Sequence, residues 1–158
     1  MSSTIKARNQ KDEQFRNTIM PRRNVAVLGS TGIVAQRLQQ RLAIHPWFEL
    51  VAVAGSKESA GMKLSELPWR LEENRPLLQE ITVIDSSSPD LISQLKNENV
   101  ELIFSALPND VAATMEIPLA EAGFNVFSNS SQNRCREGIP LVVADLNPHH
   151  LLHYKSQK

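Results

Sequence analysis

The sequence predicts a doubly wound α/β fold, in which a mostly parallel sheet has helices on both of its faces. Two observations indicate this fold. From Asn24 onward, short apolar runs alternate with longer amphipathic runs, and the 158 residues include 41% hydrophobic ones, enough for one core. Strands that alternate with helices pair in parallel through right-handed crossovers, so this order favours one α/β domain.

Short apolar runs are the predicted strands. Each is rich in the β-branched and other apolar residues that are typical of a buried strand. In chain order they cover residues 25–29, 48–55, 80–85, 100–107, 124–129 and 140–146. Residues 64–74 are expected to form a loop with at most a short helix, because Pro68 interrupts anything longer.

The first amphipathic run is the predicted helix after the first strand. Val34, Leu38 and Leu42 lie four residues apart, which places them on one face of a helix. The helix should end at His45-Pro46, because the residue before a proline avoids the helical conformation.

The second predicted helix opens at Ser88-Pro89-Asp90 and runs to about Lys96. These three residues supply a cap, a proline in the first turn and an early acidic side chain, which are all typical of a helix start.

A third helix is predicted over residues 109–123, where Gly123 closes it and Pro118 should kink it. Asn147 and Pro148 have the form of a cap and a first turn, so a further helix is expected to begin there.

Composition excludes several classes of function. Lysine plus arginine and aspartate plus glutamate both number 17, so the formal net charge is zero and nothing indicates a nucleic-acid or membrane-surface partner. The single cysteine, Cys135, allows neither an internal disulfide nor a multi-cysteine metal site. A reducing, cytoplasmic compartment fits this composition, and no apolar run approaches the length of roughly 20 residues that a membrane-spanning helix needs.

The first 23 residues differ from the rest of the chain. They are polar and of mixed charge, lack the apolar block of a signal peptide, and contain Asp12 and Glu13, which transit peptides avoid. We expect a mobile polar extension over residues 1–23 and a dinucleotide-binding domain over residues 24–158.

The first strand-to-helix turn has the composition of a phosphate cradle. Gly29 directly follows the strand and Gly32 opens the helix, so unpaired backbone N–H groups and the helix dipole would favour an anion there. The spacing G-x-x-G-x-x-A, with Thr31 in the middle and Ala35 last, differs from the better known G-x-G-x-x-G. A plain tight turn is the alternative.

The end of the second strand favours NADP over NAD. NAD sites usually place an acidic residue there for the ribose 2′-hydroxyl, whereas this chain has Ser56, Lys57 and Ser59, which suit a 2′-phosphate. Glu58 in the same loop weakens this argument, and an ordinary polar surface loop is the alternative.

Longer motifs resemble those of aspartate-semialdehyde dehydrogenases, in the order found in that family. They are VAVLGSTGIVAQRL, AGSKESAGMKLSE, LIFSALPNDVA, AEAGFNVFSNSSQNR and GIPLVVADLNPHHL. The resemblance extends from about Asn24 to Leu152. It implies a Rossmann-type NADP-binding domain, which in the family precedes a separate catalytic and dimerisation domain, in an oligomeric enzyme of amino-acid biosynthesis.

The resemblance also implies roles for particular residues. Residues of the glycine turn would surround the pyrophosphate, namely Gly29, Ser30, Thr31, Gly32, Ile33 and Val34. Residues after the second strand would face the adenosine ribose phosphate, namely Ser56, Lys57 and Ser59. Residues after the fourth and fifth strands would line the cofactor on its nicotinamide side, namely Ser105, Ala106, Leu107, Pro108, Asn129, Ser130 and Ser131. Arg134 would hold the substrate phosphate.

The sequence departs from the family pattern in three places. Ala35 replaces a frequent third glycine, and Asp145 replaces a frequent glutamate. The family's nucleophilic cysteine, in an N-C-T or N-C-S motif, and its acid/base histidine have no counterpart in residues 1–158. Cys135 has no paired base, so we expect no catalytic residue in these 158 residues and no dehydrogenase activity from them alone.

Alternatives remain beside this expectation. The chain is also compatible with a non-catalytic NADP-binding module or a decayed fragment, or with a relative that reduces malonyl-CoA or N-acetyl-glutamyl phosphate. His149, His150 and His153 are not expected to bind a metal, because no further ligands accompany them.

Overall fold

The computed structural model describes residues 21–78 and 80–157. Residues 1–20 of the predicted extension therefore lie outside the described residues. Its last residue, Arg23, is part of the first strand, so the predicted boundary is wrong there. The Arg23 N–H donates to the carbonyl of Trp47 at 2.9 Å, and its guanidinium pairs with Glu101 at 2.9 Å. Both contacts tie Arg23 to the sheet.

Strands and helices alternate along the described chain, as predicted. The strands are β1 (Arg23–Leu28), β2 (Phe48–Gly55), β3 (Ile84–Asp85), β4 (Leu102–Ser105) and β5 (Asn125–Ser128). The helices are α2 (Ile33–Leu42), α3 (Leu91–Asn97) and α4 (Asn109–Glu121), with short 3-10 helices η1 (Leu64–Glu66) and η2 (Pro148–Gln157). All strand pairs are parallel and their order is β3-β2-β1-β4-β5, which confirms the doubly wound fold.

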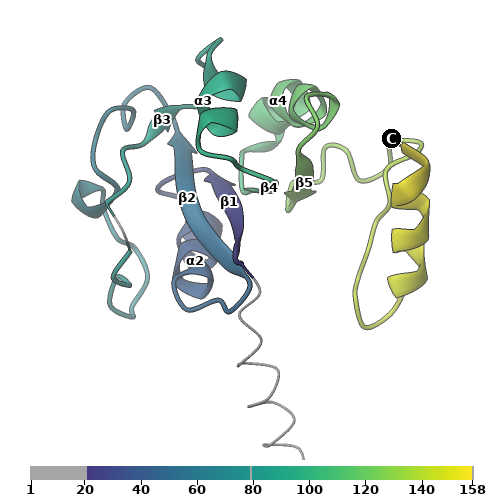
Figure 1. Ribbon diagram of the computed structural model, residues 1–158, viewed down its shortest axis with the longest axis horizontal. Coiled ribbons are helices and arrows are strands. Elements are labelled where there is room, and N and C mark those ends of the chain that lie inside the picture. The colour runs from purple at the N-terminus through teal and green to yellow at the C-terminus, as the bar shows by residue number, and fades with distance from the viewer. Residues whose placement is uncertain (1–20, 79, 158) are drawn as a thin grey trace, which may run out of the picture.

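The sheet lies among α2, α3 and α4 (Figure 1). It separates two apolar cores. On one face, Val25 and Val27 of β1 pack with Ala35 and Leu42 of α2. On the other face, Leu28 belongs to the core that α3 and α4 cover. This alternation follows from the two-residue period of a strand, because successive side chains point to opposite faces. β1 is buried on both sides, which fixes its register.

The register brings the strand ends to one edge of the sheet. Leu28 lies opposite Ala54 of β2 and opposite Ser105 of β4, and Ser105 lies opposite Ser128 of β5. Because all strands are parallel, the residues that follow them meet along this carboxyl edge, where α/β proteins bind their ligands.

The predicted strand over residues 140–146 is absent from the structure. This segment instead turns back on itself, because the Asn147 side chain accepts a hydrogen bond from the Val143 N–H at 2.5 Å and donates to the Leu141 carbonyl at 2.8 Å. Leu141, Val143 and Leu146 are exposed, so the apolar run has no sheet to join among the described residues. η2 starts at Pro148, where the sequence predicted a helix start.

The predicted apolar face of the first helix is confirmed at Leu42, which is buried, and at Leu38, which packs against the core, but it is wrong at Val34. Val34 is 47% exposed, whereas Ala35, Gln36, Gln39 and Leu42 are buried. The reason is that two glutamines replace apolar residues on the buried face and use their amides to hold backbone groups.

Two further differences concern length. β3 has only two residues in place of the predicted run from residue 80, and α4, with Pro118 inside it as predicted, ends at Glu121 rather than at Gly123. Within the described part of the chain, no helix is both long and apolar enough to cross a membrane.

Candidate functional site

The glycine turn connects β1 to α2 at the carboxyl edge. The Gly29 N–H donates to the Ala54 carbonyl at 2.8 Å, and Gly29 has φ +100°, which side chains rarely tolerate. A β-carbon at Gly29 would lie 3.1 Å from the Ala106 carbonyl oxygen. By contrast, Gly32 caps α2 with no atom within 4 Å of an added β-carbon. The turn is therefore tightly packed at its first glycine and open at its second.

The open side of this turn presents the start of α2. The first N–H groups of any helix lack partners within it, and the dipole makes that end electropositive. Ile33 and Val34 are exposed on this first turn. Ser30 is buried and Thr31 half-buried. The arrangement can accept an anion above Gly32.

A pair of buried hydroxyl groups joins the glycine turn to the end of β2. The Ser30 and Ser59 hydroxyls lie 3.1 Å apart, and Ser59 also donates to the Ser56 carbonyl at 3.0 Å. Both fit only because residue 55 is glycine: a β-carbon there would lie 2.3 Å from the Ser30 hydroxyl and 2.5 Å from that of Ser59. The Ser59 hydroxyl thus points into the protein and fixes the loop rather than facing the solvent.

Ser56, Lys57 and Glu58 form the exposed part of the same loop. A hydrogen bond from the Ser56 side chain is the main cause that lowers the pKa of Glu58. The pKa of Asp85, at the end of β3, is lowered chiefly by hydrogen bonds from Ser87 and further by the charge of Lys57. Lys57 also lowers the pKa of Glu58. The lysine therefore lies in the field of two carboxylates.

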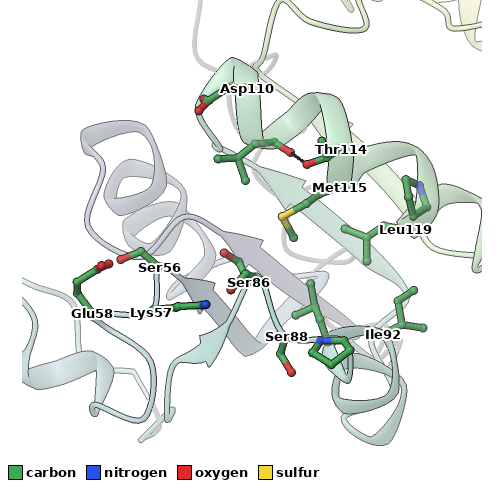
Figure 2. Close-up of a pocket in the computed structure, with 15 residues that line it drawn as sticks. Ser56, Lys57, Glu58, Ser86, Ser88, Ile92, Asp110, Thr114, Met115 and Leu119 are labelled. Atoms are coloured by element: carbon green, nitrogen blue, oxygen red, sulfur yellow. Dashed lines mark hydrogen bonds between the residues drawn. The ribbon is translucent and has the colours of Figure 1, made fainter.

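A cavity of about 700 Å³ opens beside this loop. Figure 2 shows Ser56, Lys57 and Glu58 on one side of it and Thr114 and Met115 of α4 on the other. Ser86, Ser87, Ser88 and Pro89 line its base, before α3. Polar groups thus lie at the strand ends, and the helices contribute mostly apolar groups together with Asp110 and Thr114 of α4, which is typical of a site for a flat, partly apolar ligand.

Two buried glutamines of α2 support the turn. Gln39 donates to the Ser30 carbonyl at 3.1 Å. Gln36 donates to the Pro68 carbonyl at 2.7 Å and accepts from the Arg70 N–H at 2.7 Å. These contacts attach the loop after η1 to α2.

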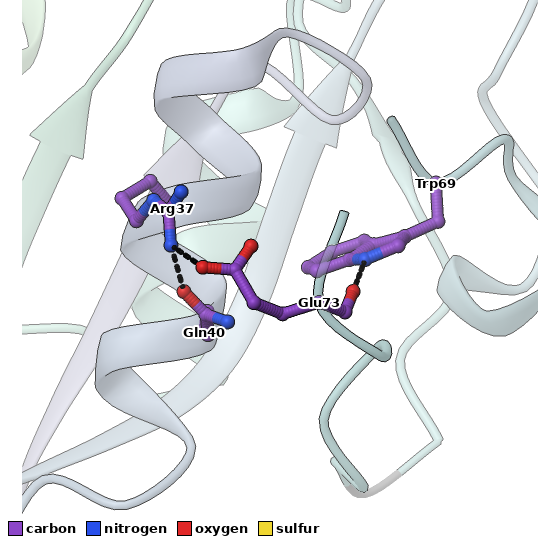
Figure 3. Close-up of polar contacts among 4 residues, drawn as sticks. All are labelled: Arg37, Gln40, Trp69 and Glu73. Carbon is purple, nitrogen blue, oxygen red and sulfur yellow. Dashed lines mark hydrogen bonds and ion pairs between the residues drawn. The ribbon is translucent and has the colours of Figure 1, made fainter. Parts of the chain in front are cut away.

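The same loop has a second, exposed attachment to α2 (Figure 3). Arg37 donates to Gln40 at 2.6 Å and pairs with Glu73 at 2.7 Å, while the Trp69 indole donates to the Glu73 carbonyl at 2.7 Å. Arg75 donates to the carbonyls of Leu64 and Leu67. These contacts hold the loop against α2 and η1.

The ends of β4 and β5 are joined by a buried carboxylate. Glu116 of α4 is 4% exposed and accepts hydrogen bonds from Ser105 at 2.7 Å and Ser128 at 2.6 Å on one oxygen. Its other oxygen accepts from the Asn133 amide at 2.9 Å. Ser105 is itself buried, and Leu107 also lies in the core, whereas Pro108 is exposed.

Asn109, the first residue of α4, holds the loop after β5. It accepts a hydrogen bond from the Ser130 hydroxyl at 2.7 Å and from the Ser131 N–H at 3.2 Å, and its amide donates to the Ser131 hydroxyl at 3.0 Å. The Asn129 N–H donates to the Ser105 carbonyl at 3.1 Å. The predicted nicotinamide-side residues are therefore brought together by α4.

The remaining predicted residues lie farther along the chain. Arg134 and Cys135 are both exposed in the loop after β5. His150 contacts Asn147 at 3.0 Å and lies against His149, whereas the side chain of His153 lies outside the described residues. Among the described residues, no cluster of histidine, cysteine and acidic side chains has the form of a metal site.

The sequence did not predict the helix residues whose side chains hold the loops at the carboxyl edge of the sheet. Gln36, Gln39, Asn109 and Glu116 were not singled out, because a polar residue in a helix is usually exposed. One available signal was that serines end both the fourth and the fifth strand, and buried hydroxyls need partners.

Comparisons with known proteins agree with this architecture. Residues 24–154 match the family described as "Semialdehyde dehydrogenase, NAD binding domain". An aspartate-semialdehyde dehydrogenase of Archaeoglobus fulgidus is 40% identical over 131 residues, which are 82% of this chain and 36% of that protein. A malonyl CoA reductase (NADP) of Metallosphaera sedula is 34% identical over 125 residues, 78% of this chain and 33% of that protein.

A solved structure is similar as well. The crystal structure of aspartate semialdehyde dehydrogenase with NADP from Candida albicans matches with a TM-score of 0.72 and 34% identity, over 82% of this chain and 36% of that one. This chain therefore spans about a third of the length of these relatives.

The strand order and the glycine turn at the carboxyl edge define a Rossmann-type NAD(P)-binding domain. More particularly, the chain belongs to the family of the semialdehyde dehydrogenase NAD-binding domain. The family predicted from the sequence motifs is thus confirmed.

Proposed function

We propose that this chain binds NADP along the carboxyl edge, as the nucleotide-binding part of an aspartate-semialdehyde dehydrogenase. The main supporting observation is the glycine turn, where Gly29 is packed against Ala106 and Gly32 is open above the start of α2. The pyrophosphate would lie over residues 29–34, in contact with N–H groups at the helix start.

The two halves of the cofactor would then extend to opposite sides of β1. The cavity beside Ser56 and Lys57 would hold the adenosine half, with these two residues at the 2′-phosphate. Ser59 would act indirectly, since its hydroxyl holds Ser30 and the Ser56 carbonyl. The nicotinamide half would extend over residues 105–108 and 129–131.

In this proposal the described residues bind and orient, and they do not perform the covalent step. When bound, NADP would supply the hydride acceptor for oxidation of an aldehyde-level carbon. Arg134 would hold a substrate phosphate, because its guanidinium is exposed and presents paired donors. Cys135 is an exposed free cysteine and is not assigned to the chemistry.

A second substrate is supported by one comparison. The relative from Metallosphaera sedula is described as a malonyl CoA reductase that uses NADP. Reactions with either substrate need the same cofactor at the same edge of the sheet, so the proposed NADP site is the same for both. A non-catalytic NADP-binding role also shares this site.

Isothermal titration with NADP and with NAD tests the proposal. We expect one NADP per chain and an NAD affinity lower by about tenfold, because the 2′-phosphate adds a charge-assisted contact with Lys57. Lys57→Met should remove this difference and leave NAD binding unchanged. If wild-type protein shows no heat with NADP, the proposed site is wrong, and equal affinities would contradict the assignment of NADP.

Glu58→Gln should strengthen NADP binding. The carboxylate accepts the Ser56 hydroxyl and lies in the field of Lys57, so it opposes a 2′-phosphate in the same loop. Because the group is exposed, the gain should be only roughly twofold to fivefold and should decrease as salt is added. NAD affinity should stay constant. Glu49→Gln, an equal charge change at an exposed position nearer the start of β2, is the control, and an unchanged NADP affinity in Glu58→Gln would contradict the prediction.

A further inference from the structure

Glu116 is a buried carboxylate that the proposed binding of cofactor does not explain. It is 4% exposed, and all three of its hydrogen-bond donors are neutral: Ser105, Ser128 and Asn133. Among the described residues, no lysine, arginine or histidine forms an ion pair with it. Burying an ionisable group is unfavourable, and an apolar side chain would fill the same space without that cost. The burial of Glu116 is therefore better explained by a role beyond packing.

The three donors belong to three different segments. Ser105 ends β4, Ser128 ends β5, and Asn133 lies in the loop that follows β5. Ser105 and Ser128 are opposite each other in the sheet, and both donate to the same Glu116 oxygen. The carboxylate thus fixes the spacing of the two strand ends and the position of the loop beyond them.

The first turn of the same helix completes this arrangement. Asn109 holds Ser130 and Ser131, so α4 contacts the loop after β5 at residues 130, 131 and 133. The segment between the end of β5 and Arg134 is therefore attached to one rigid element by two side chains, Asn109 and Glu116.

We infer that Glu116 is a positioning residue for the nicotinamide half of the cofactor site. The inference rests on the proposed binding of NADP. The strand order places β2 and β3 on one side of β1 and β4 and β5 on the other. In the described part of the chain, the three hydrogen bonds of Glu116 lie on the β4–β5 side, whereas Ser56 and Lys57 follow β2. The carboxylate therefore acts on one half of the dinucleotide and not on the other.

Glu116→Gln tests this division with two ligands, NADP and adenosine 2′,5′-bisphosphate. The amide keeps the size of the side chain and one acceptor oxygen for the two serines, but its NH₂ group meets the NH₂ group of Asn133. We expect the NADP affinity to fall about tenfold, as for the loss of a hydrogen bond to a charged group. The affinity for the bisphosphate, which lacks the nicotinamide half, should change less than twofold.

A compensating change gives a second readout. In the double variant Glu116→Gln/Asn133→Asp, the new amide donates to the new carboxylate, which restores the contact with donor and acceptor exchanged. NADP affinity should recover to within about threefold of wild type. Glu121→Gln is the matched control, because it makes the same change at an exposed position of α4 and should alter neither affinity.

The outcomes separate this inference from the proposal beneath it. If wild-type protein binds neither ligand, the proposed NADP site fails and the inference fails with it. If wild type binds both ligands but Glu116→Gln lowers both affinities equally, or neither, only the positioning role is wrong. Should Glu116→Gln not fold, Ser128→Ala removes one donor and leaves the carboxylate in place; it should weaken NADP alone, and equal effects on both ligands would again overturn the inference.

Discussion

Gly55→Ala is expected to destabilise the domain by about 2–4 kcal/mol, because the new methyl group needs space that two hydroxyl groups occupy. Its β-carbon would lie 2.3 Å from the Ser30 hydroxyl and 2.5 Å from the Ser59 hydroxyl. Both serines are buried, at 5% and 6% exposure, so neither hydroxyl can simply turn into solvent. Their mutual hydrogen bond at 3.1 Å would be lost as well.

Urea denaturation followed by circular dichroism measures this effect. The variant Ser30→Ala/Ser59→Ala removes both hydroxyls, and adding Gly55→Ala to it should then cost less than in the wild-type background. This non-additivity distinguishes a local clash from a general preference for glycine. If Gly55→Ala unfolds at the wild-type urea concentration, the packing of the three residues is described incorrectly.

Much of the fold follows from local patterns in the sequence. β2 was predicted to the residue and β1 to within two residues because both are rich in apolar residues, and a parallel strand that is buried on both faces has this composition. The glycine turn was predictable for a related reason: few residues other than glycine accept the φ of +100° at position 29. Features of this kind are determined by the residues close to them in sequence.

Errors arose where a hydrogen-bond partner that the apolar pattern does not indicate decides the structure. Residues 140–146 have the composition of a strand, but a strand needs a neighbour, and the amide of Asn147 closes a turn instead. The face of α2 was predicted from apolar spacing, yet Gln36 is buried because the Pro68 carbonyl and the Arg70 N–H lie beside it. Glu116 was missed for the same reason, since its donors lie 11, 12 and 17 residues away.

Gly29→Ala is expected to reduce both stability and NADP binding. A residue other than glycine at φ +100° carries strain of about 1–3 kcal/mol, and its β-carbon would approach the Ala106 carbonyl oxygen to 3.1 Å. Relief of that contact would separate the glycine turn from the end of β4, where the two halves of the proposed cofactor site meet. We therefore expect the free energy of unfolding to fall and NADP affinity to fall by at least tenfold.

Gly32→Ala is the matched comparison, since nothing lies within 4 Å of its added β-carbon and its φ of −68° suits alanine. Its stability should change by less than about 1 kcal/mol, the range for a helix cap. If the pyrophosphate lies over this turn, the new methyl group projects into its space, and NADP affinity should still fall. Glycine is then needed at the two positions for different reasons: at residue 29 for both folding and cofactor binding, and at residue 32 for cofactor binding alone. An NADP affinity that Gly32→Ala leaves unchanged would place the pyrophosphate elsewhere, and a stability that Gly29→Ala leaves unchanged would contradict the packing against β4.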